Sequence, residues 1–501
     1  MENQLEQLRT FMAEIYDLER AAALLEWDQQ TYMPPGGIEV RSEQIATLLR
    51  KAHEAFVSDR LGDLLASLSA ANGRWEYDSD EASLIRETER TRTRKARLPA
   101  ALVAALARAG SRGMMIWQQA RAAADYEMFK PALSELLDLR RQEAECLGPY
   151  DHMYDPLLDK FEPGMKTADV QTMFDSFKTE LIDLVAAISE RADAVSNAIL
   201  KRTYPVSAQQ QFGLAVARQL GYDFARGRQD ESAHPFTTSF STTDVRITTR
   251  YEENWLPAGL FGTIHEVGHG LYEQGIAASL NRSGLQNGAS LGMHESQSRL
   301  YENLIGRSRI FWQYYFPRLQ AAFPHVLADV TADDFYRAIN AVEPSLIRVE
   351  ADEVTYNLHI LIRFELEQAL LTGDLSLDDL PEAWNDKYEA YLGLRPPNDA
   401  VGVLQDVHWS EGSIGYFPTY SIGNVISVQI WERIKSDIPD LEDQIARGQF
   451  ETLRAWLAEK LHRHGKKFTP PEPHQRLLGG PVDSRPYMQY LKAKYGEIYG
   501  L

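Results

Sequence analysis

Residues 257–275 read Pro-Ala-Gly-Leu-Phe-Gly-Thr-Ile-His-Glu-Val-Gly-His-Gly-Leu-Tyr-Glu-Gln-Gly. Proline is favoured at the start of a helix and glycine at its end, so this stretch predicts a helix over 258–274. Residues four apart lie on the same helical face, so His265 and His269 can bind one metal ion. Glu266 projects beside them as a candidate general base. The pattern predicts a catalytic zinc site for hydrolysis, with peptides as the expected substrates.

A catalytic zinc also needs a third protein ligand and an open position for water. In metzincins, Gly and His would follow at fixed positions, but Tyr272 and Gly275 stand there and exclude that pattern. We predict that Glu295, on the next helix, is the third ligand. Its rivals are Glu273, which is too close in sequence to His269 to approach the ion from another direction, and Glu302, which we expect to hydrogen-bond a ligating histidine.

The composition indicates a globular protein with a substantial core, since 44% of the 501 residues are hydrophobic and 25% are charged. A formal charge of -20 argues against nucleic-acid binding, which needs clustered cations. A single cysteine, Cys146, excludes an internal disulfide framework and fits a reducing compartment. Neither a secretory signal nor a membrane span is visible. We therefore expect a cytoplasmic protein with no nucleic-acid or membrane partner.

Apolar residues at three-, four- and seven-residue steps predict a mainly α protein. A helical hairpin is expected over 1–55, around the turn at Met33–Gly37, and further helices over 80–147, 165–198, 207–220, 293–305, 332–342, 353–371 and 423–436. Only 236–251 has the period of strands, because Val245 and Ile247 alternate with polar residues. We expect one small antiparallel sheet there, beside the metal-binding helix.

Five further stretches, in the right order, resemble the carboxypeptidase Taq family of metallocarboxypeptidases nearly end to end. They are Trp27-Asp28-Gln29 with Met33-Pro34, Asp244-Val-Arg246-Ile-Thr248, His294-Glu295-Ser296-Gln297, Ile347-Arg348-Val-Glu-Ala351-Asp352 and Gly402-Val-Leu-Gln405-Asp406-Val-His408-Trp409. We expect His294 itself to be a structural hydrogen-bonding group. Arg299 lies one turn after Glu295 and leaves the hydrogen-bonding partners of the ligands open.

The resemblance implies removal of single C-terminal amino acids from peptides with broad specificity, and one Zn²⁺ or Co²⁺ per chain in a homodimer. It also implies a single peptidase domain over 1–501, a two-lobed helical body with a deep active-site groove, similar in outline to angiotensin-converting enzyme and the oligopeptidases. The hairpin over 1–55 is our candidate for a lid over that groove.

An enzyme acting at the C-terminus of a peptide must pair its carboxylate with a cation, and the planar fork of arginine fits best. Arg348 and Arg246 are the candidates for this role. The alternative for each is a buried ion pair, with Asp352 or Asp244 respectively. The family resemblance favours Arg348 as the substrate-binding residue.

His408, Tyr416 and Tyr420 fall in a glycine-rich stretch that predicts a loop. His408 and Tyr420 are candidate catalytic donors to the developing oxyanion, and Tyr416 is a candidate substrate contact. Packing aromatics are the competing interpretation. The strand over 244–249 is either a groove edge that pairs with an extended peptide or an ordinary hairpin, and His234 is a candidate groove-lining residue.

Three other functions compete with a carboxypeptidase. The nearest is an oligoendopeptidase or dipeptidyl carboxypeptidase on the same fold, which the sequence separates poorly. A non-catalytic peptide-binding protein would have a structural metal closed by four protein ligands, whereas we find three beside Glu266. Metal-dependent hydrolysis of a non-peptide amide is the third.

Overall fold

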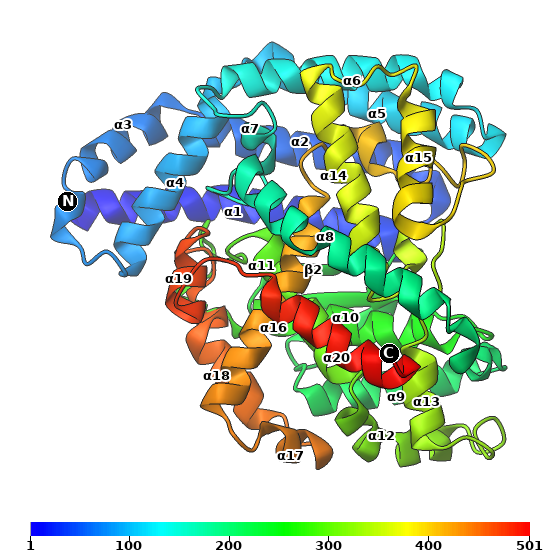
Figure 1. Ribbon diagram of the computed structural model, residues 1–501. Helices are drawn as coiled ribbons and strands as arrows, with labels where there is room; N and C mark the ends of the chain where they lie inside the picture. The colour runs from blue at the N-terminus through cyan, green and yellow to red at the C-terminus, as the bar shows by residue number, and fades with distance from the viewer. Residues whose placement is uncertain (1) are drawn as a thin grey trace.

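The computed structural model describes residues 2–501, and its helices surround one small sheet (Figure 1). Helix accounts for 67% of the residues and strand for 3%, which confirms the mainly α prediction. The α-helices of the described residues are α1 (Glu2–Thr31), α2 (Ile38–Phe56), α3 (Asp59–Ser69), α4 (Asp80–Arg97), α5 (Ala100–Ala123), α6 (Tyr126–Cys146), α7 (Asp155–Leu158), α8 (Thr167–Ser189), α9 (Val206–Leu220), α10 (Leu256–Gly275), α11 (Leu291–Arg299), α12 (Arg309–Ala322), α13 (Ala332–Ile339), α14 (Tyr356–Thr372), α15 (Leu380–Leu392), α16 (Pro418–Asp437), α17 (Leu441–Ala446), α18 (Glu451–Lys460), α19 (Glu472–Leu478) and α20 (Arg485–Tyr499).

The predicted helices differ from the observed ones mainly at their breaks. The stretch predicted over 80–147 divides into three helices, because Pro99 precedes α5 and Ala124 adopts a left-handed conformation (φ 52°) before α6. The helix predicted over 293–305 is α11 followed by a π-helical segment, Leu300–Gly306. The helices predicted over 1–55 are α1 and α2, which pack together; Met1 lies outside the described residues.

The sheet is mixed, which corrects the antiparallel sheet that we predicted. Strand β2 (Thr237–Ser241) pairs antiparallel with β3 (Asp244–Thr249), as expected for the hairpin. A strand that the sequence pattern missed, β1 (Gly227–Glu231), pairs parallel with the other side of β3. The order is therefore β1-β3-β2, and β3 is the central strand. Both of its edges are occupied, so its backbone cannot hold a peptide as we suggested.

Buried apolar residues form two clusters. The larger one spans the chain from Trp117 to Tyr499, including the inner face of α10. The smaller one joins α1–α4 with Ile276, Leu280 and Leu285, which follow α10. The N-terminal helices thus share a core with the segment that leaves the metal-binding helix. No helix of residues 2–501 has both the length and the apolar character needed to cross a membrane.

Helix α11 is held between α10 and α16 at glycines. A Cβ added at Gly268 of α10 would lie 2.6 Å from both the carbonyl oxygen of Gln297 and the Cα of Ser298. A Cβ added at Gly423 of α16 would lie 2.6 Å from the Cβ and Cγ of Glu295. The absence of side chains at these two positions lets the backbones approach, and this close packing fixes where the carboxylate of Glu295 lies.

We predict that Gly268→Ala destabilises the protein by roughly 1–3 kcal/mol, because the new methyl group meets backbone that cannot rotate away. The same substitution at a helix position without close neighbours stabilises by up to about 1 kcal/mol. The sign of the change in stability therefore shows whether α10 packs closely on α11. Gly496→Ala in α20 is the matched control, since its added Cβ has only an ordinary contact at 3.8 Å. Chemical denaturation measures both; equal effects of the two substitutions would contradict the close packing of α10 on α11.

Candidate metal centre

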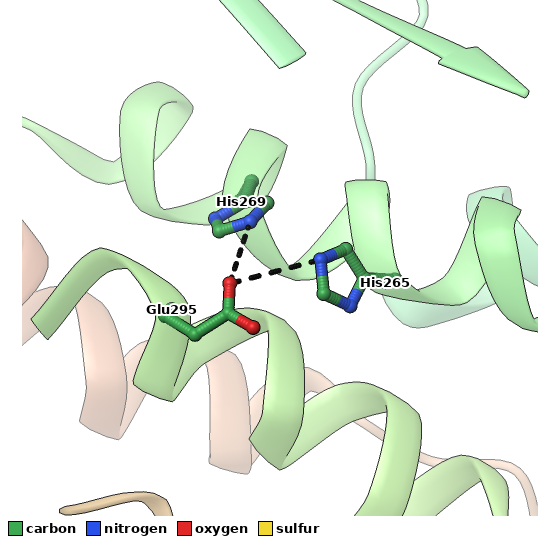
Figure 2. Close-up of side chains that lie close together, drawn as sticks. All are labelled: His265, His269 and Glu295. Atoms are coloured by element: carbon green, nitrogen blue, oxygen red, sulfur yellow. Dashed lines mark ion pairs between the residues drawn. The ribbon is translucent and has the colours of Figure 1, made fainter. Parts of the chain in front are cut away.

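Two histidines of α10 and one glutamate of α11 point at a common centre (Figure 2). Nε2 of His269 lies 3.4 Å from Oε2 of Glu295, and Nε2 of His265 lies 3.8 Å from the same oxygen. One ligand atom from each residue lies within 4.8 Å of the others. The structure therefore brings together His265, His269 and Glu295, the three residues that the sequence singled out as metal ligands.

A hydrogen bond from Nδ1 orients each imidazole, on the side of the ring away from Nε2. Nδ1 of His265 lies 2.9 Å from Oε2 of Glu302, to which it donates. Nδ1 of His269 lies 2.6 Å from Nδ1 of His294, whose Nε2 is 2.9 Å from Oε1 of Glu273. With Glu273 accepting from His294, His294 accepts from His269, so both ligating rings keep Nε2 free toward the centre.

The structure shows what Glu273 and Glu302, the two alternative candidates for the third ligand, contact. Glu302 and Glu273 each bond a histidine and neither belongs to the converging set. His294 is the hydrogen-bonding group that we predicted. Glu302 lies in the π-helical segment after α11, a feature that often occurs at functional sites.

Arg299 is the partner that the sequence left open. Its Nε donates to Oε1 of Glu295 at 2.6 Å, and its Nη1 donates to Oε2 of Glu302 at 3.2 Å. Burial opposes ionisation of Glu295, but Arg299 and His265 outweigh it and hold the pKa of that carboxyl well below its usual range. Glu295 is therefore a carboxylate, whose Oε2 accepts from Oγ of Ser298 at 3.1 Å and also faces the two histidines.

The geometry and charge of the centre fit a divalent metal. A tetrahedral ion with bonds of about 2.0–2.1 Å has ligand atoms about 3.3–3.4 Å apart, close to the 3.4 and 3.8 Å that separate Oε2 of Glu295 from the two histidines. Burial lowers the pKa of His269 to about 3, so its ring is neutral, as a ligand must be. Burial opposes protonation of His265 too, but Glu295 and Glu302 raise its pKa, which shows that their negative charge favours a cation at this point.

Glu266 is buried next to the three converging residues, at 4% exposure. Its Oε2 accepts a hydrogen bond of 2.6 Å from Oγ1 of Thr237 on β2. Burial raises the pKa of Glu266, as expected of a carboxyl that exchanges protons. Thr237 is a site residue that sequence reasoning missed: the sequence predicted the sheet beside this helix but did not show which strand residue faces Glu266.

His408, Tyr416 and Tyr420 cluster in space as they do in sequence. The ring of Tyr416 lies 5.2 Å from that of His408 and 5.4 Å from that of Tyr420. The predicted loop contains His408 in a short 3₁₀ turn, but Tyr420 lies in the first turn of α16, one turn before Gly423, which corrects its loop assignment. Burial lowers the pKa of His408 to about 4, so its imidazole is neutral.

Arg348 is buried beside this cluster at 4% exposure, with its guanidinium 5.2 Å from the ring of Tyr420. Its carboxylate partner is Asp406, at 2.9 Å, and not Asp352, which accepts from Thr355. Asp406 also accepts from Nε of Arg363, at 2.6 Å. Two buried guanidiniums thus share one carboxylate, which leaves a surplus positive charge that a second carboxylate can neutralise.

Tyr356 connects Arg348 to the metal centre. Its hydroxyl accepts from Nη1 of Arg348 at 3.0 Å, and its ring lies 4.6 Å below the guanidinium of Arg299. Arg299 in turn holds Glu295. The side chain of Tyr356 therefore lies between the metal centre and the cluster around Arg348.

Arg246 lies elsewhere, against the N-terminal helix. It pairs with both oxygens of Asp244 at 2.9 Å, and its guanidinium is 4.3 Å from the ring of Trp27. The ion pair with Asp244 is the alternative that the sequence left open for this residue. His234 is exposed, and its backbone carbonyl accepts from Ser232.

Comparison with known proteins gives consistent results. The family model of the carboxypeptidase Taq (M32) metallopeptidases matches residues 7–495. Thermostable carboxypeptidase 1 of Thermus thermophilus is 42% identical over 99% of both chains, and carboxypeptidase 1 of Bacillus subtilis is 38% identical over 98% of this chain and 99% of the relative.

Solved structures agree over the same length. The crystal structure of the M32 carboxypeptidase from Deinococcus radiodurans R1 superposes with a TM-score of 0.96 at 40% identity, covering 100% of both chains. Metallocarboxypeptidase 1 of Trypanosoma cruzi superposes with a TM-score of 0.94 at 32% identity, covering 99% of this chain and 100% of the other. With a metal centre of two histidines and a glutamate, this chain is a metallocarboxypeptidase and belongs to the carboxypeptidase Taq (M32) family.

Proposed function

We propose that this enzyme removes single C-terminal amino acids from peptides, with zinc held by His265, His269 and Glu295 and with Glu266 as general base. The observation that carries the proposal is the convergence of these three ligands beside a buried carboxyl group. Cobalt, which accepts the same donors and geometry, is the alternative metal. Broad specificity, a homodimer and a cytoplasmic location stay predictions, and sedimentation of the purified chain tests the dimer.

A divalent metal bound here polarises the scissile carbonyl and makes water more acidic. Glu266 takes the water proton and transfers it to the leaving amine, while Thr237 orients its carboxylate through Oε2. Tyr420 and His408 are the donors proposed for the oxyanion that develops on the carbonyl. Their neutral rings supply hydrogen bonds without opposing the metal charge.

Arg348 is the proposed anchor for the C-terminal carboxylate of the substrate. Its support is the surplus positive charge that it shares with Arg363 over Asp406. Arg246 has its own carboxylate, Asp244, within 2.9 Å, which makes it the weaker candidate. Tyr416, between His408 and Tyr420, is the proposed aromatic contact for the peptide.

The hairpin of α1 and α2 is the proposed lid. Polar contacts attach α1 to the sheet beside the metal helix: Nη1 of Arg20 donates to the carbonyl of Ser239 at 2.7 Å, and Arg246 stacks on Trp27. The first half of α1 is held by the apolar core that it shares with Ile276, Leu280 and Leu285, whereas these polar and cation-π contacts in its second half separate at lower cost. The end of the hairpin beside the sheet is therefore the part that suits opening and closing.

Glu266→Gln removes the proton acceptor but no ligand. We expect the variant to keep one metal per chain, measured by elemental analysis, and to lose at least about 10³-fold in kcat on a peptide substrate. Chelation of the wild type should abolish hydrolysis, and Zn²⁺ or Co²⁺ should restore it. Full activity of the metal-loaded variant would disprove Glu266 as the base.

A peptide and its C-terminal amide separate an exopeptidase from an oligoendopeptidase. We expect the wild type to release one residue at a time from the free acid and to cleave the amide at least about 100-fold more slowly, as mass spectrometry of the products would show. Release of dipeptides, or equal internal cleavage of both peptides, would favour the rival functions.

Arg348→Met removes the proposed carboxylate anchor. We expect kcat/KM on the free acid to fall on the order of 10- to 100-fold, because a charge-assisted hydrogen bond is lost, while the amide is affected little. Arg246→Met is the control and should preserve the preference for the free acid. A parallel loss on acid and amide would assign Arg348 a structural role.

The lid predicts slower amide exchange in α1 (Glu2–Thr31) when peptide binds. The Glu266→Gln variant allows hydrogen exchange to be measured with an intact peptide bound. Unchanged protection of α1 at saturating peptide would rule the lid out, and exchange in α20, far along the chain, serves as the internal reference.

A further inference from the structure

A cavity of about 620 Å³ lies between α4, α5 and α6 and is lined by six cationic side chains. We call it the basic cavity. Its cations are Arg90, Arg94, Lys95, Arg140, Lys160 and Lys466. Its acidic lining residues are only three, Glu143, Asp159 and Glu411. The formal charge of the whole chain is -20, so the charge of this cavity is opposite in sign to that of the protein.

Four of the cations form ion pairs with three nearby carboxylates. Arg94 pairs with Asp159 at 3.0 Å, and Arg140 pairs with Glu143. Arg90 and Lys466 both pair with Glu87, at 2.9 and 2.8 Å. These pairs hold the wall of the cavity together, and because Arg90 and Lys466 share one carboxylate, they leave one positive charge in surplus.

Lys160 and Lys95 are different. Among the described residues, no carboxylate lies within 4.0 Å of the Lys160 ammonium, which is 5.3 Å from the ring of Phe161. Lys95 has only Glu19 at 4.0 Å and the ring of Phe56 at 4.4 Å. Burial lowers the pKa of both lysines, and neighbouring Arg140 lowers that of Lys160 further. An anion bound between them would relieve both effects.

The basic cavity adjoins the metal centre through two shared segments. Lys160 precedes Phe161, whose ring lies 5.1 Å from Tyr416 and whose carbonyl accepts from Leu291, the first residue of α11. Glu411 ends the 3₁₀ turn that begins with His408. Phe161 and Tyr416 thus connect the lining of the basic cavity to the candidate site.

Given the proposed function, the direction of the peptide follows. A carboxypeptidase holds one residue beyond the scissile bond, and that residue ends at the C-terminal carboxylate. Every other side chain of the substrate lies on the N-terminal side. Any part of the peptide that reaches a second cavity must therefore come from this side.

We propose that the basic cavity is a subsite for an acidic side chain of the substrate, upstream of the scissile bond, with Lys160 and Lys95 as its cations. The five apolar residues in its lining, Leu98, Val103, Leu106, Ala107 and Met114, contact the aliphatic part of such a side chain. The subsite is a specificity determinant and takes no part in the chemical step.

The test uses N-acetylated alanine peptides that carry one Glu, moved in turn from the second to the fifth position from the C-terminus, each matched with its Gln counterpart. The wild type should prefer Glu over Gln about fivefold in kcat/KM at one of these positions, and less at high salt because the charges are then screened. Lys160→Met and Lys95→Met should remove this preference and leave the rates on the Gln peptides unchanged. Lys492→Met, at an exposed lysine of α20 that pairs with Glu180, is the control.

Glu411→Gln gives an independent check with the opposite sign. It removes the negative charge of the lining that has no cation within 4.0 Å among the described residues, so the preference for Glu should increase. Equal rates on Glu and Gln peptides in the wild type, or equal losses on both in the lysine variants, would overturn the subsite. Failure to cleave either the Glu or the Gln peptides would instead count against the proposed carboxypeptidase reaction.

Discussion

The position of one short helix, α11, determines the rest of the site. Gly268 and Gly423 allow α10 and α16 to approach it until backbone and Cβ contacts leave no room for a methyl group. Glu295 is thereby placed opposite two imidazoles that come from another helix. Rigid helices position ligands more accurately than loops, and a displacement of a few tenths of an ångström would change all the ligand separations together.

Charge explains why the centre needs this rigidity. Four carboxyl groups surround it, of which Glu266, Glu273 and Glu295 are buried and Glu302 is partly buried. The guanidinium of Arg299 bridges Glu295 and Glu302, and a divalent cation held by His265, His269 and Glu295 would neutralise much of the remaining negative charge. Because each ligand is held by a hydrogen-bonding partner on its far side, the free ligand atoms face inward before the metal binds.

The cluster around Arg348 has an excess of positive charge, opposite to the excess of negative charge at the metal centre. Arg348 and Arg363 share Asp406, and Tyr356 separates them from the metal centre. A carboxypeptidase must recognise a negatively charged chain end close to a positively charged metal. Two clusters, one with excess negative charge and one with excess positive charge, lie on either side of Tyr356 and are compatible with this requirement.

The chemistry could be predicted from the amino-acid sequence, because helical periodicity is local. The spacing of His265 and His269 fixes them on one face wherever the helix lies, and the motif order indicated Glu295 and the family. Tertiary structure alone decided the contacts between distant segments. The parallel strand β1, the hydrogen bond of Thr237 to Glu266 and the sharing of Asp406 by two arginines depend on how elements pack, and β1 lacks the alternating pattern that would reveal it. For the same reason the sequence could not choose between Asp352 and Asp406 as the partner of Arg348: separation along the chain does not determine which buried charges meet.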